Sequence, residues 1–250
     1  MKQTRDIMGM PVTVNIADIP GSQEYFDRVF DYLEHVDEKF STYKYDSEIS
    51  RINRGEISSE KLSKEMKEIF TLSEKTKKET LGYFDIQKPD GSYDPSGIVK
   101  GWAIKNAAQL LKKMGCKNFF VDVGGDIESR GIDEEGKEWS VGIRSPFNRD
   151  EIVKVVYPKG RGVATSGVYI RGKHIYNPHS GKSVETDMVS LTVIGPDVYE
   201  ADRFATAAFA MGNRGIEFIE SISDFEGYAI DKNGIAVMTS GFLDFTVAGF

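Results

Sequence analysis

Two oxygen-bearing side chains stand four residues apart in a segment with helical periodicity. The segment reads YEADRFATAAFAMG and carries Asp202 and Thr206. Residues at this spacing lie on the same face of a helix. Two oxygen ligands placed in this way suit a hard cation such as Mg²⁺, which fills its remaining positions with water and phosphate oxygens. The alternative is structural, with a salt-bridged Asp beside a core Thr.

A second segment, YDPSGIVKGWA, combines an acid, small residues and a lysine at the predicted start of a helix. Backbone N–H groups at a helix N-terminus, together with Lys100, suit a phosphate group. A capped turn with an exposed lysine is the alternative. In VGGDIESRG, Gly124 and Gly125 would let the backbone approach a ligand closely, or would simply form a hairpin turn. That segment lacks the third glycine and the following helix of a dinucleotide-binding fingerprint.

The richest segment, GVATSGVYIRGKHIYNPHSGK, carries hydroxyls, an arginine and two histidines. His174 is a candidate general base near an anionic ligand, because imidazole titrates close to physiological pH. It also falls in an alternating pattern that fits a plain strand residue. His174 and His179 flank Pro178, so neither helical nor strand geometry directs both rings at one metal, and we do not predict a zinc site. His35, between acidic residues of a helix, is predicted to be a surface residue.

Amphipathic helices and short strands must position these residues. Helices are predicted over 22–40, 62–82, 98–114, 198–212 and 215–222, and strands over 8–18, 118–123, 137–143, 151–157, 160–166, 189–195, 227–231 and 235–240. The stretch from Gly82 to Gly101 is dense in Gly, Pro, Asp and Ser, which favours turns. Since no repeat or linker divides the chain, we predict one intertwined α+β unit over residues 1–250, with mixed or antiparallel sheets and packed helices.

Composition excludes several classes of protein. The 250 residues include 32 Lys and Arg against 39 Asp and Glu, a net charge of −7 without a basic stripe, which argues against nucleic-acid binding. The single cysteine, Cys116, cannot form an internal disulfide. No run of about 18 apolar residues predicts a membrane span. The N-terminal segment lacks the apolar core of a signal peptide. We therefore expect a cytoplasmic protein as the sequence stands, the alternative being an exported form whose leader has been removed.

The order of these segments adds to their separate meaning. MGM, FSTYKYDSEISRIN, GYFD, YDPSGIVKGWA, VGGDIESRG, ATSGVYIR, HIYNPHSGK and EADRFATAAFAMG follow one another along almost the whole chain. In this the chain resembles the ApbE-like FAD:protein FMN transferases. The resemblance implies an ApbE-like fold and a Mg²⁺-dependent enzyme. Such an enzyme transfers FMN from FAD to a Thr or Ser hydroxyl of a target flavoprotein through a phosphoester, and releases AMP.

The resemblance also implies roles for individual residues in binding FAD. Met8 begins the segment that lies against the flavin, and Tyr43 occupies the aromatic position that stacks on the isoalloxazine. The residues that match the FAD-lining turn are Tyr83, Phe84 and Asp85. Asp94 and Lys100 match the acidic and the phosphate-side positions of DxxGxxKG, and Ile175 is at a position that touches the nucleotide.

The metal and the proton are assigned in the same way. The resemblance implies Mg²⁺ bound by the backbone carbonyl of Gly97 and by the side chains of Asp202 and Thr206. His174 matches the His of the HxxxP turn, and we assign it as the base toward the acceptor hydroxyl. Phosphoryl-type transfer needs mainly alignment and charge neutralisation, which Mg²⁺ and Lys100 would supply. The expected acceptor is a flavoprotein with a DxxTGAT-like segment. This chain has no such segment, so we do not expect self-modification.

The chain departs from the family pattern in two further places. Met10 replaces the usual Thr after Met-Gly, which removes a hydroxyl. The segment from Asp85 to Asp94 is shorter than in many relatives, which predicts a more open rim of the FAD site.

Two other functions stay open at the level of sequence. One is a Mg²⁺-dependent FAD pyrophosphatase, in which water replaces the protein hydroxyl. Tyr43, in place of a small polar residue, favours transfer. The other is a non-catalytic flavin-binding protein, against which the set of His174, Asp202 and Thr206 argues, because binding alone needs no base beside a metal.

Overall fold

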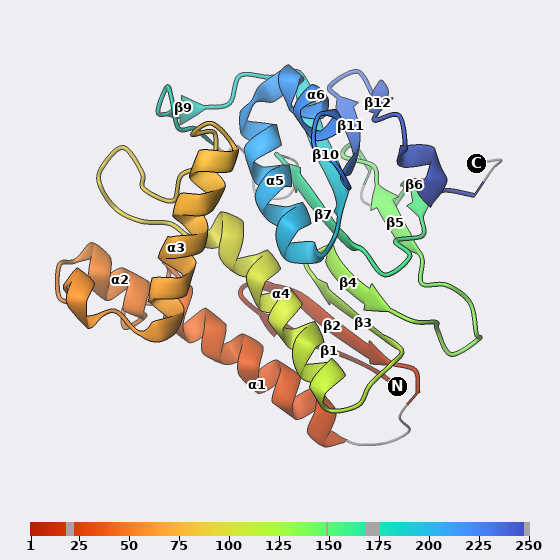
Figure 1. Cartoon of the computed structure of the whole chain (residues 1–250), viewed down its shortest axis with the longest axis horizontal. Helices are drawn as coiled ribbons and strands as arrows, with labels where there is room; N and C mark the ends of the chain where they lie inside the picture. Colours follow the sequence, from red (N-terminus) through yellow and green to blue (C-terminus); the bar gives the residue numbers. More distant parts are fainter. Residues whose placement is uncertain (19–22, 149, 169–175, 248–250) are drawn as a thin grey trace.

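An eight-stranded sheet runs through the computed structural model, in the order β1-β2-β3-β4-β7-β10-β11-β12, and every neighbouring pair is antiparallel (Figure 1). The structure describes residues 1–18, 23–148, 150–168 and 176–247. The strands of the sheet are β1 (Lys2–Ile7), β2 (Met10–Ile16), β3 (Phe119–Val123), β4 (Asp126–Arg130), β7 (Gly162–Gly167), β10 (Met188–Gly195), β11 (Glu226–Asp231) and β12 (Ala236–Met238). The predicted α+β class is confirmed.

Helices cover one face of this sheet. They are α1 (Gln23–Phe40), α2 (Glu48–Asn53), α3 (Lys64–Glu79), α4 (Ser96–Lys113), α5 (Val198–Ala210) and α6 (Gly215–Glu220), with short 3₁₀ turns η1 (Ser59–Lys61), η2 (Gly212–Arg214) and η3 (Phe242–Phe245). The apolar side of α1 is buried at the predicted helical spacing, from Phe26 to Phe40. Helices α1 and α4 pack over β1 to β4, and α5 and α6 pack over β7, β10 and β11.

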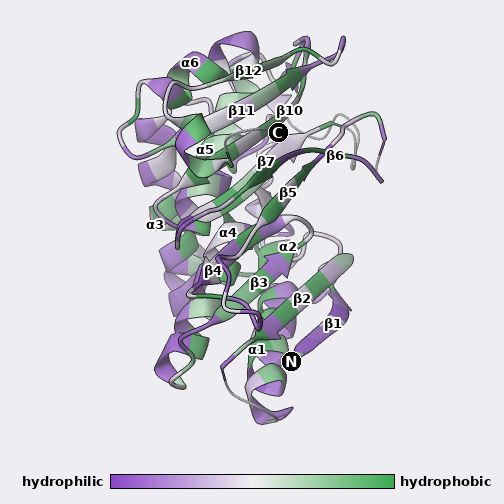
Figure 2. Ribbon diagram, turned by 90° about the vertical axis from the view of Figure 1, so that its right-hand side faces the viewer, coloured by the Kyte–Doolittle hydropathy of each residue, from purple (hydrophilic) through white to green (hydrophobic). Residues whose placement is uncertain are grey.

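A two-stranded sheet, β5 (Val141–Arg144) with β6 (Ile152–Val156), lies against the opposite face. Its buried side chains Val141, Ile143 and Val156 share a core cluster with Val163 and Ile194 of the large sheet. Figure 2 shows β5 and β6 on the side of the sheet away from α3, α4 and α5. The remaining pair, β8 (Tyr176–Asn177) with β9 (Lys182–Ser183), lies beside the end of α3.

The predicted elements appear close to their expected positions, and the structure adds the strands β1, β4, β8 and β9 and the helix α2, besides three short 3₁₀ turns. β1 pairs with β2 through a turn at Met8 and Gly9, where both residues have positive φ. The short helix α2 begins at Ser47, whose side chain accepts a hydrogen bond from the backbone N–H of Ser50. Neither element was predicted. The β3–β4 connection is the hairpin turn that we considered for Gly124 and Gly125, and both residues have positive φ.

Candidate active site

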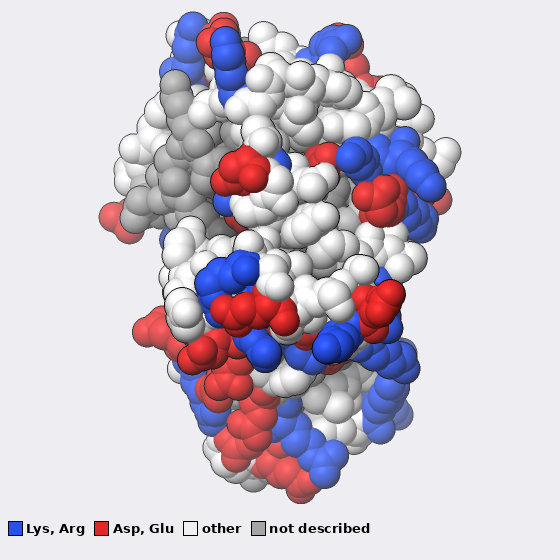
Figure 3. Space-filling view, turned by 90° about the vertical axis from the view of Figure 1, so that its left-hand side faces the viewer, with Lys and Arg blue, Asp and Glu red and all other residues white. Residues whose placement is uncertain are grey.

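A cavity of about 380 Å³ opens between the β1–β2 turn, the segment after α3, the start of α4, the β3–β4 turn, the end of β7 and α5. Its walls include Gly9, Met10, Tyr83, Phe84, Asp85, Asp94, Ser96, Gly97, Lys100, Gly124, Thr165, Ser166, Gly167, Tyr176, Pro178, Asp202, Thr206 and Ala210. Segments that are far apart in sequence therefore meet here. Figure 3 views the neighbouring surface from the side of α2 and α3, where acidic and basic side chains are interspersed.

Two buried carboxylates and one ammonium group form a polar cluster at this cavity, in which Lys100 and Asp202 line the cavity and Asp126 contacts Lys100 from outside the lining. Lys100 Nζ lies 2.5 Å from Asp126 Oδ2 and 3.9 Å from Asp202 Oδ1. The Gly101 backbone N–H donates to Asp202 Oδ2 at 2.8 Å, and the Thr165 backbone N–H donates to Asp126 Oδ1 at 3.0 Å. Asp126 is 1% exposed and Asp202 is 3% exposed. We call Lys100, Asp126 and Asp202 the acid–lysine centre.

The acid–lysine centre carries a formal excess of negative charge when both carboxylates are ionised. Burial raises the pKa of Asp202, Lys100 lowers it, and the carboxylate of Asp126 raises it again. A second cation in the cavity would relieve this repulsion.

Close packing of α4 on α5 brings the acid–lysine centre together. A Cβ on Gly101 would lie 2.7 Å from Asp202 Cβ and 2.9 Å from the Val198 carbonyl oxygen, so only glycine permits this approach. One turn earlier on α4, a Cβ on Gly97 would lie 3.6 Å from Thr206 Oγ1. Gly97, Asp202 and Thr206 therefore stand along one seam between the two helices, and Asp202 and Thr206 lie on the same face of α5, as their spacing predicted.

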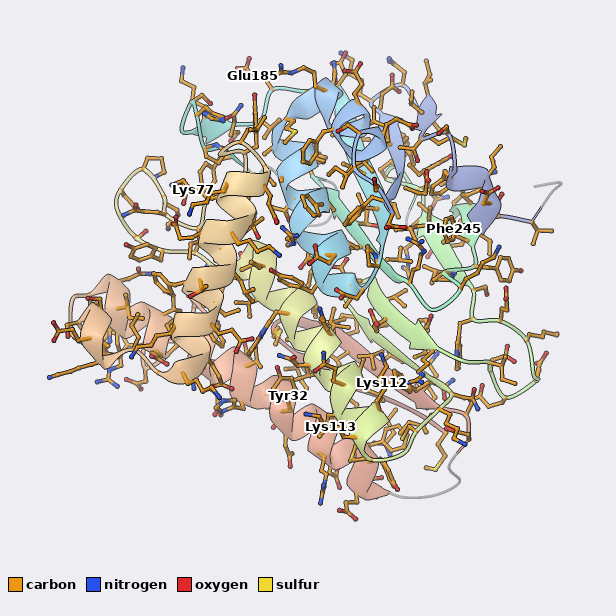
Figure 4. The ribbon with its side chains drawn as sticks, in the orientation of Figure 1. Tyr32, Lys77, Lys112, Lys113, Glu185 and Phe245 are labelled. Atoms are coloured by element: carbon orange, nitrogen blue, oxygen red, sulfur yellow. The ribbon has the colours of Figure 1, made fainter. Side chains whose placement is uncertain are left out.

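The segment after α3 forms the opposite wall. Leu81 and Gly82 have positive φ and turn the chain back, and the Phe84 backbone N–H donates to Thr80 Oγ1 at 3.1 Å. Asp85 pairs with Lys77 of α3 at 2.6 Å, and Figure 4 labels Lys77 on α3. Tyr83 accepts a hydrogen bond from Arg214 at 2.7 Å. These contacts within the protein hold the wall in place without a contribution from a ligand.

The structure brings together most, but not all, of the predicted site residues. The predicted residues that line the cavity are Tyr83, Phe84, Asp85, Asp94, Gly97, Lys100, Asp202 and Thr206. Met8 and Tyr43 do not line it: Met8 packs against the core, and the Tyr43 ring, 98% exposed, extends from the α1–α2 connection. His174 and Ile175 lie outside the described residues.

One residue of the centre was missed. Asp126 was noted only as part of a glycine-rich turn, although the GGD segment was the available signal. Its pairing with Lys100 depends on the position of β4 under α4.

The donors present suit Mg²⁺. Among the described residues, no three Asp, Glu, His or Cys side chains gather into a metal cluster. Mg²⁺, however, is commonly held by one or two carboxylates with the rest of its shell supplied by water and phosphate. A buried, negatively charged centre beside a Thr hydroxyl and a helix backbone matches that mode.

Comparison with known proteins decides the family. The model of the ApbE family matches residues 8–88 and 87–229. The chain belongs to the ApbE family.

Relatives in this family agree over most of the chain. A protein of Escherichia coli K12 named FAD:protein FMN transferase is 28% identical, over 89% of this chain and 82% of its own length. One from Vibrio cholerae with the same name is 27% identical, over 82% of this chain and 78% of its own length. In both cases the matched segment covers most of the two chains, so the resemblance extends well beyond one motif.

Solved ApbE structures share the fold. The flavin transferase ApbE from Vibrio cholerae superimposes with a TM-score of 0.85 at 23% identity, covering 98% of each chain. The apo flavinyl transferase ApbE of Pseudomonas stutzeri gives 0.86 at 22% identity, covering all of this chain and 97% of that one. Within the described part of this ApbE chain, no helix is both long and apolar enough to cross a membrane.

Proposed function

We propose that this ApbE protein transfers FMN from FAD to a Thr or Ser hydroxyl of a target protein. In this reaction the hydroxyl oxygen forms a bond to the phosphorus of the FMN half, the bond from that phosphorus to the bridging oxygen of the pyrophosphate breaks, and AMP leaves. The hydroxyl proton passes to a base. The observation that carries the proposal is the meeting of Lys100, Asp202 and Thr206 at one cavity in a chain of this family.

We assign the metal to the seam between α4 and α5. Asp202, Thr206 and the Gly97 carbonyl would hold Mg²⁺, which when bound neutralises charge on the pyrophosphate. The Gly101 backbone N–H orients the Asp202 carboxylate by its hydrogen bond to Oδ2. This orientation is set by the helix backbone, so it does not depend on a mobile side chain.

Lys100 contributes charge and Asp126 places it. The Lys100 ammonium is held by Asp126 at 2.5 Å and reaches the cavity wall, where it can also contact a phosphate oxygen. Asp126 is itself held by the Thr165 backbone N–H. An ammonium group already held beside the phosphate needs no reorganisation during the reaction. Such preorganised charges contribute most of the electrostatic stabilisation of a transition state.

The remaining assignments follow the family pattern. We propose that Tyr83, Phe84, Asp85 and Asp94 bind FAD from the wall after α3. Met8 and Tyr43 are proposed to contact the flavin from outside the residues that line the cavity, Ile175 to touch the nucleotide, and His174 to take the acceptor proton. A DxxTGAT-like segment is the proposed acceptor.

A direct test incubates the purified protein with FAD, Mg²⁺ and a domain that carries a DxxTGAT-like segment. We expect the acceptor to gain the mass of FMN and flavin fluorescence, with one AMP released per adduct. Free FMN with AMP and no adduct would instead establish the pyrophosphatase. Intact FAD would leave a binding protein and would refute the proposal.

A further inference from the structure

A second cavity, of about 580 Å³, lies on the other face of the large sheet, between β5 and the strands β2, β3, β4, β7 and β10. The proposed function assigns it no role. Figure 2 shows this side of the molecule, with β5 and β6 on the face of the sheet away from the helices.

The second cavity shares part of its lining with the first, beside the acid–lysine centre. Gly124 and Thr165 line both cavities. The Thr165 backbone N–H donates to Asp126, which pairs with Lys100. β4 pairs with β7 only from Ile127 to Glu128, so the strand pairing ends before the two shared lining residues Gly124 and Thr165. A chain lying in the second cavity could therefore deliver a side chain toward the proposed metal seam.

The wall formed by β5 suits an extended peptide. Residues 140–144 line the cavity without interruption. Among the described strands, β5 pairs with β6 alone, so its other edge carries backbone N–H and C=O groups that no strand uses. An unpaired strand edge is a template for the addition of an extended segment.

The remaining walls supply apolar contact and hydroxyl groups. Phe120 packs against Trp139 with ring centroids 5.5 Å apart, and Ile127 and Val163 lie beside it in the lining. Thr165 and Thr192 share a hydrogen bond between their hydroxyls at 2.9 Å. The mixture fits alternating apolar and polar side chains of a peptide.

Two cations give the cavity its charge preference. Lys2 and Arg144 both line it, and within the described residues neither forms a hydrogen bond or an ion pair through its side chain. Asp122, also in the lining, accepts from the Gly125 backbone N–H at 2.8 Å. Burial raises the pKa of Asp122, and Arg144 and Lys2 lower it. The charged residues of this lining are Lys2, Arg144 and Asp122, so the lining carries a formal charge of +1 on a protein of net charge −7, which indicates an anionic partner here.

We infer that the second cavity docks an extended, acidic segment of the acceptor protein, which adds to the free edge of β5 and places a carboxylate on Arg144 and Lys2. The acceptor hydroxyl then reaches the first cavity past Gly124 and Thr165. This inference rests on the proposed function, and it names the partner chemistry and its route to the same site.

The test measures binding of a dye-labelled peptide that carries Asp three residues before a Thr-Gly-Ala-Thr run, by fluorescence anisotropy with FAD and Mg²⁺ present. We expect Arg144→Glu, alone or with Lys2→Glu, to weaken binding by about tenfold or more, the usual effect of losing a charge-assisted hydrogen bond. FAD binding should stay within twofold. The matched control is Lys113→Glu, at the exposed end of α4 on the helical side of the sheet (Figure 4), which should leave both unchanged.

A charge exchange makes the test specific. A peptide with Lys in place of Asp should bind the wild-type chain poorly and should regain affinity for Arg144→Glu. Unchanged affinity of the acidic peptide for Arg144→Glu, with FAD cleavage intact, would overturn the docking inference alone. Loss of FAD affinity in the same variant would assign the cavity to the dinucleotide and overturn it too. Failure of the wild-type chain to cleave FAD would refute the proposed function itself.

Discussion

Replacement of Gly101 by alanine should separate activity from stability. The glycine lies where α4 crosses α5, directly after Lys100 and against Asp202. An added Cβ would sit 2.7 Å from Asp202 Cβ, whereas carbon atoms in contact prefer about 3.5 to 4.0 Å. The backbone of Val198 and Tyr199, on the same helix as Asp202, would lie only 2.9 and 3.0 Å from the added Cβ. The helices must therefore move apart by roughly 1 Å.

The substitution has two opposing effects on the free energy of unfolding. Overpacking of this kind costs about 1 to 3 kcal/mol. Alanine in place of glycine inside a helix returns about 1 kcal/mol. The free energy of unfolding should fall by no more than about 2 kcal/mol. The geometry does not recover in the same way, because the bond from the Gly101 N–H to Asp202 and the seam from Gly97 to Thr206 both widen.

The assay compares urea unfolding with Mg²⁺-dependent FAD cleavage. We expect turnover to fall on the order of 100-fold, as a displacement of about 1 Å can cause, with a modest change in the urea midpoint. Gln109→Ala, at an exposed position of α4, is the matched control and should change neither. Turnover within twofold of wild type in Gly101→Ala would refute the argument that this close approach sets the site.

Three further predictions follow from buried charges. Asp202→Asn should abolish Mg²⁺-dependent turnover and the Mg²⁺-induced rise in Tm, whereas Asp31→Asn, at an exposed position on α1, should keep both. If Mg²⁺ still raised the Tm of Asp202→Asn, Asp202 would not be a metal ligand. Burial raises the pKa of Glu128, whose carboxylate accepts from the Val198 N–H, to about 7. The folded state therefore holds this proton more tightly than the unfolded state, and stability falls as pH rises from about 4.5 through 7. In urea unfolding, the free energy of unfolding of Glu128→Gln should exceed that of the wild type by up to about 3 kcal/mol at pH 8, and the two values should converge below pH 4.5. Parallel pH profiles of the two proteins would contradict the raised pKa of Glu128. Arg203 is 2% exposed and pairs with Glu79 and Glu200. Arg203→Met should therefore lower the free energy of unfolding by about 3 kcal/mol, whereas Arg28→Met, at an exposed ion pair, should lower it by less than about 1 kcal/mol. Equal losses in the two variants would show that burial of the ion pair does not matter.

The sequence predicted most helices and strands because their apolar residues follow the period of the element. The buried set of α1, from Phe26 to Phe40, is one example. β1 escaped prediction because this edge strand has mostly polar or exposed positions, so no alternation marks it. α2 has six residues, too few for a periodic signal, and depends on the cap at Ser47.

The candidate site was predictable where its residues belong to one helix. The spacing of Asp202 and Thr206 placed both on the face of α5 that lines the cavity, and the segment around Lys100 correctly marked the start of α4. These relations follow from the 3.6-residue helical turn, which any sequence with the right pattern imposes locally.

Tertiary structure decided which charges share the site. Along the sequence, Lys100 is 26 residues from Asp126 and 102 residues from Asp202. The three side chains come together in space only because β4 lies beneath α4 and Gly101 lets α4 touch α5. The same folding leaves the Tyr43 ring exposed outside the cavity and opens a second cavity under β5. Sequence alone sets the chemistry each residue can offer and its face on its own element. The partner across the fold is fixed by packing, because burial of two carboxylates is tolerable only where a cation and backbone donors are brought to meet them.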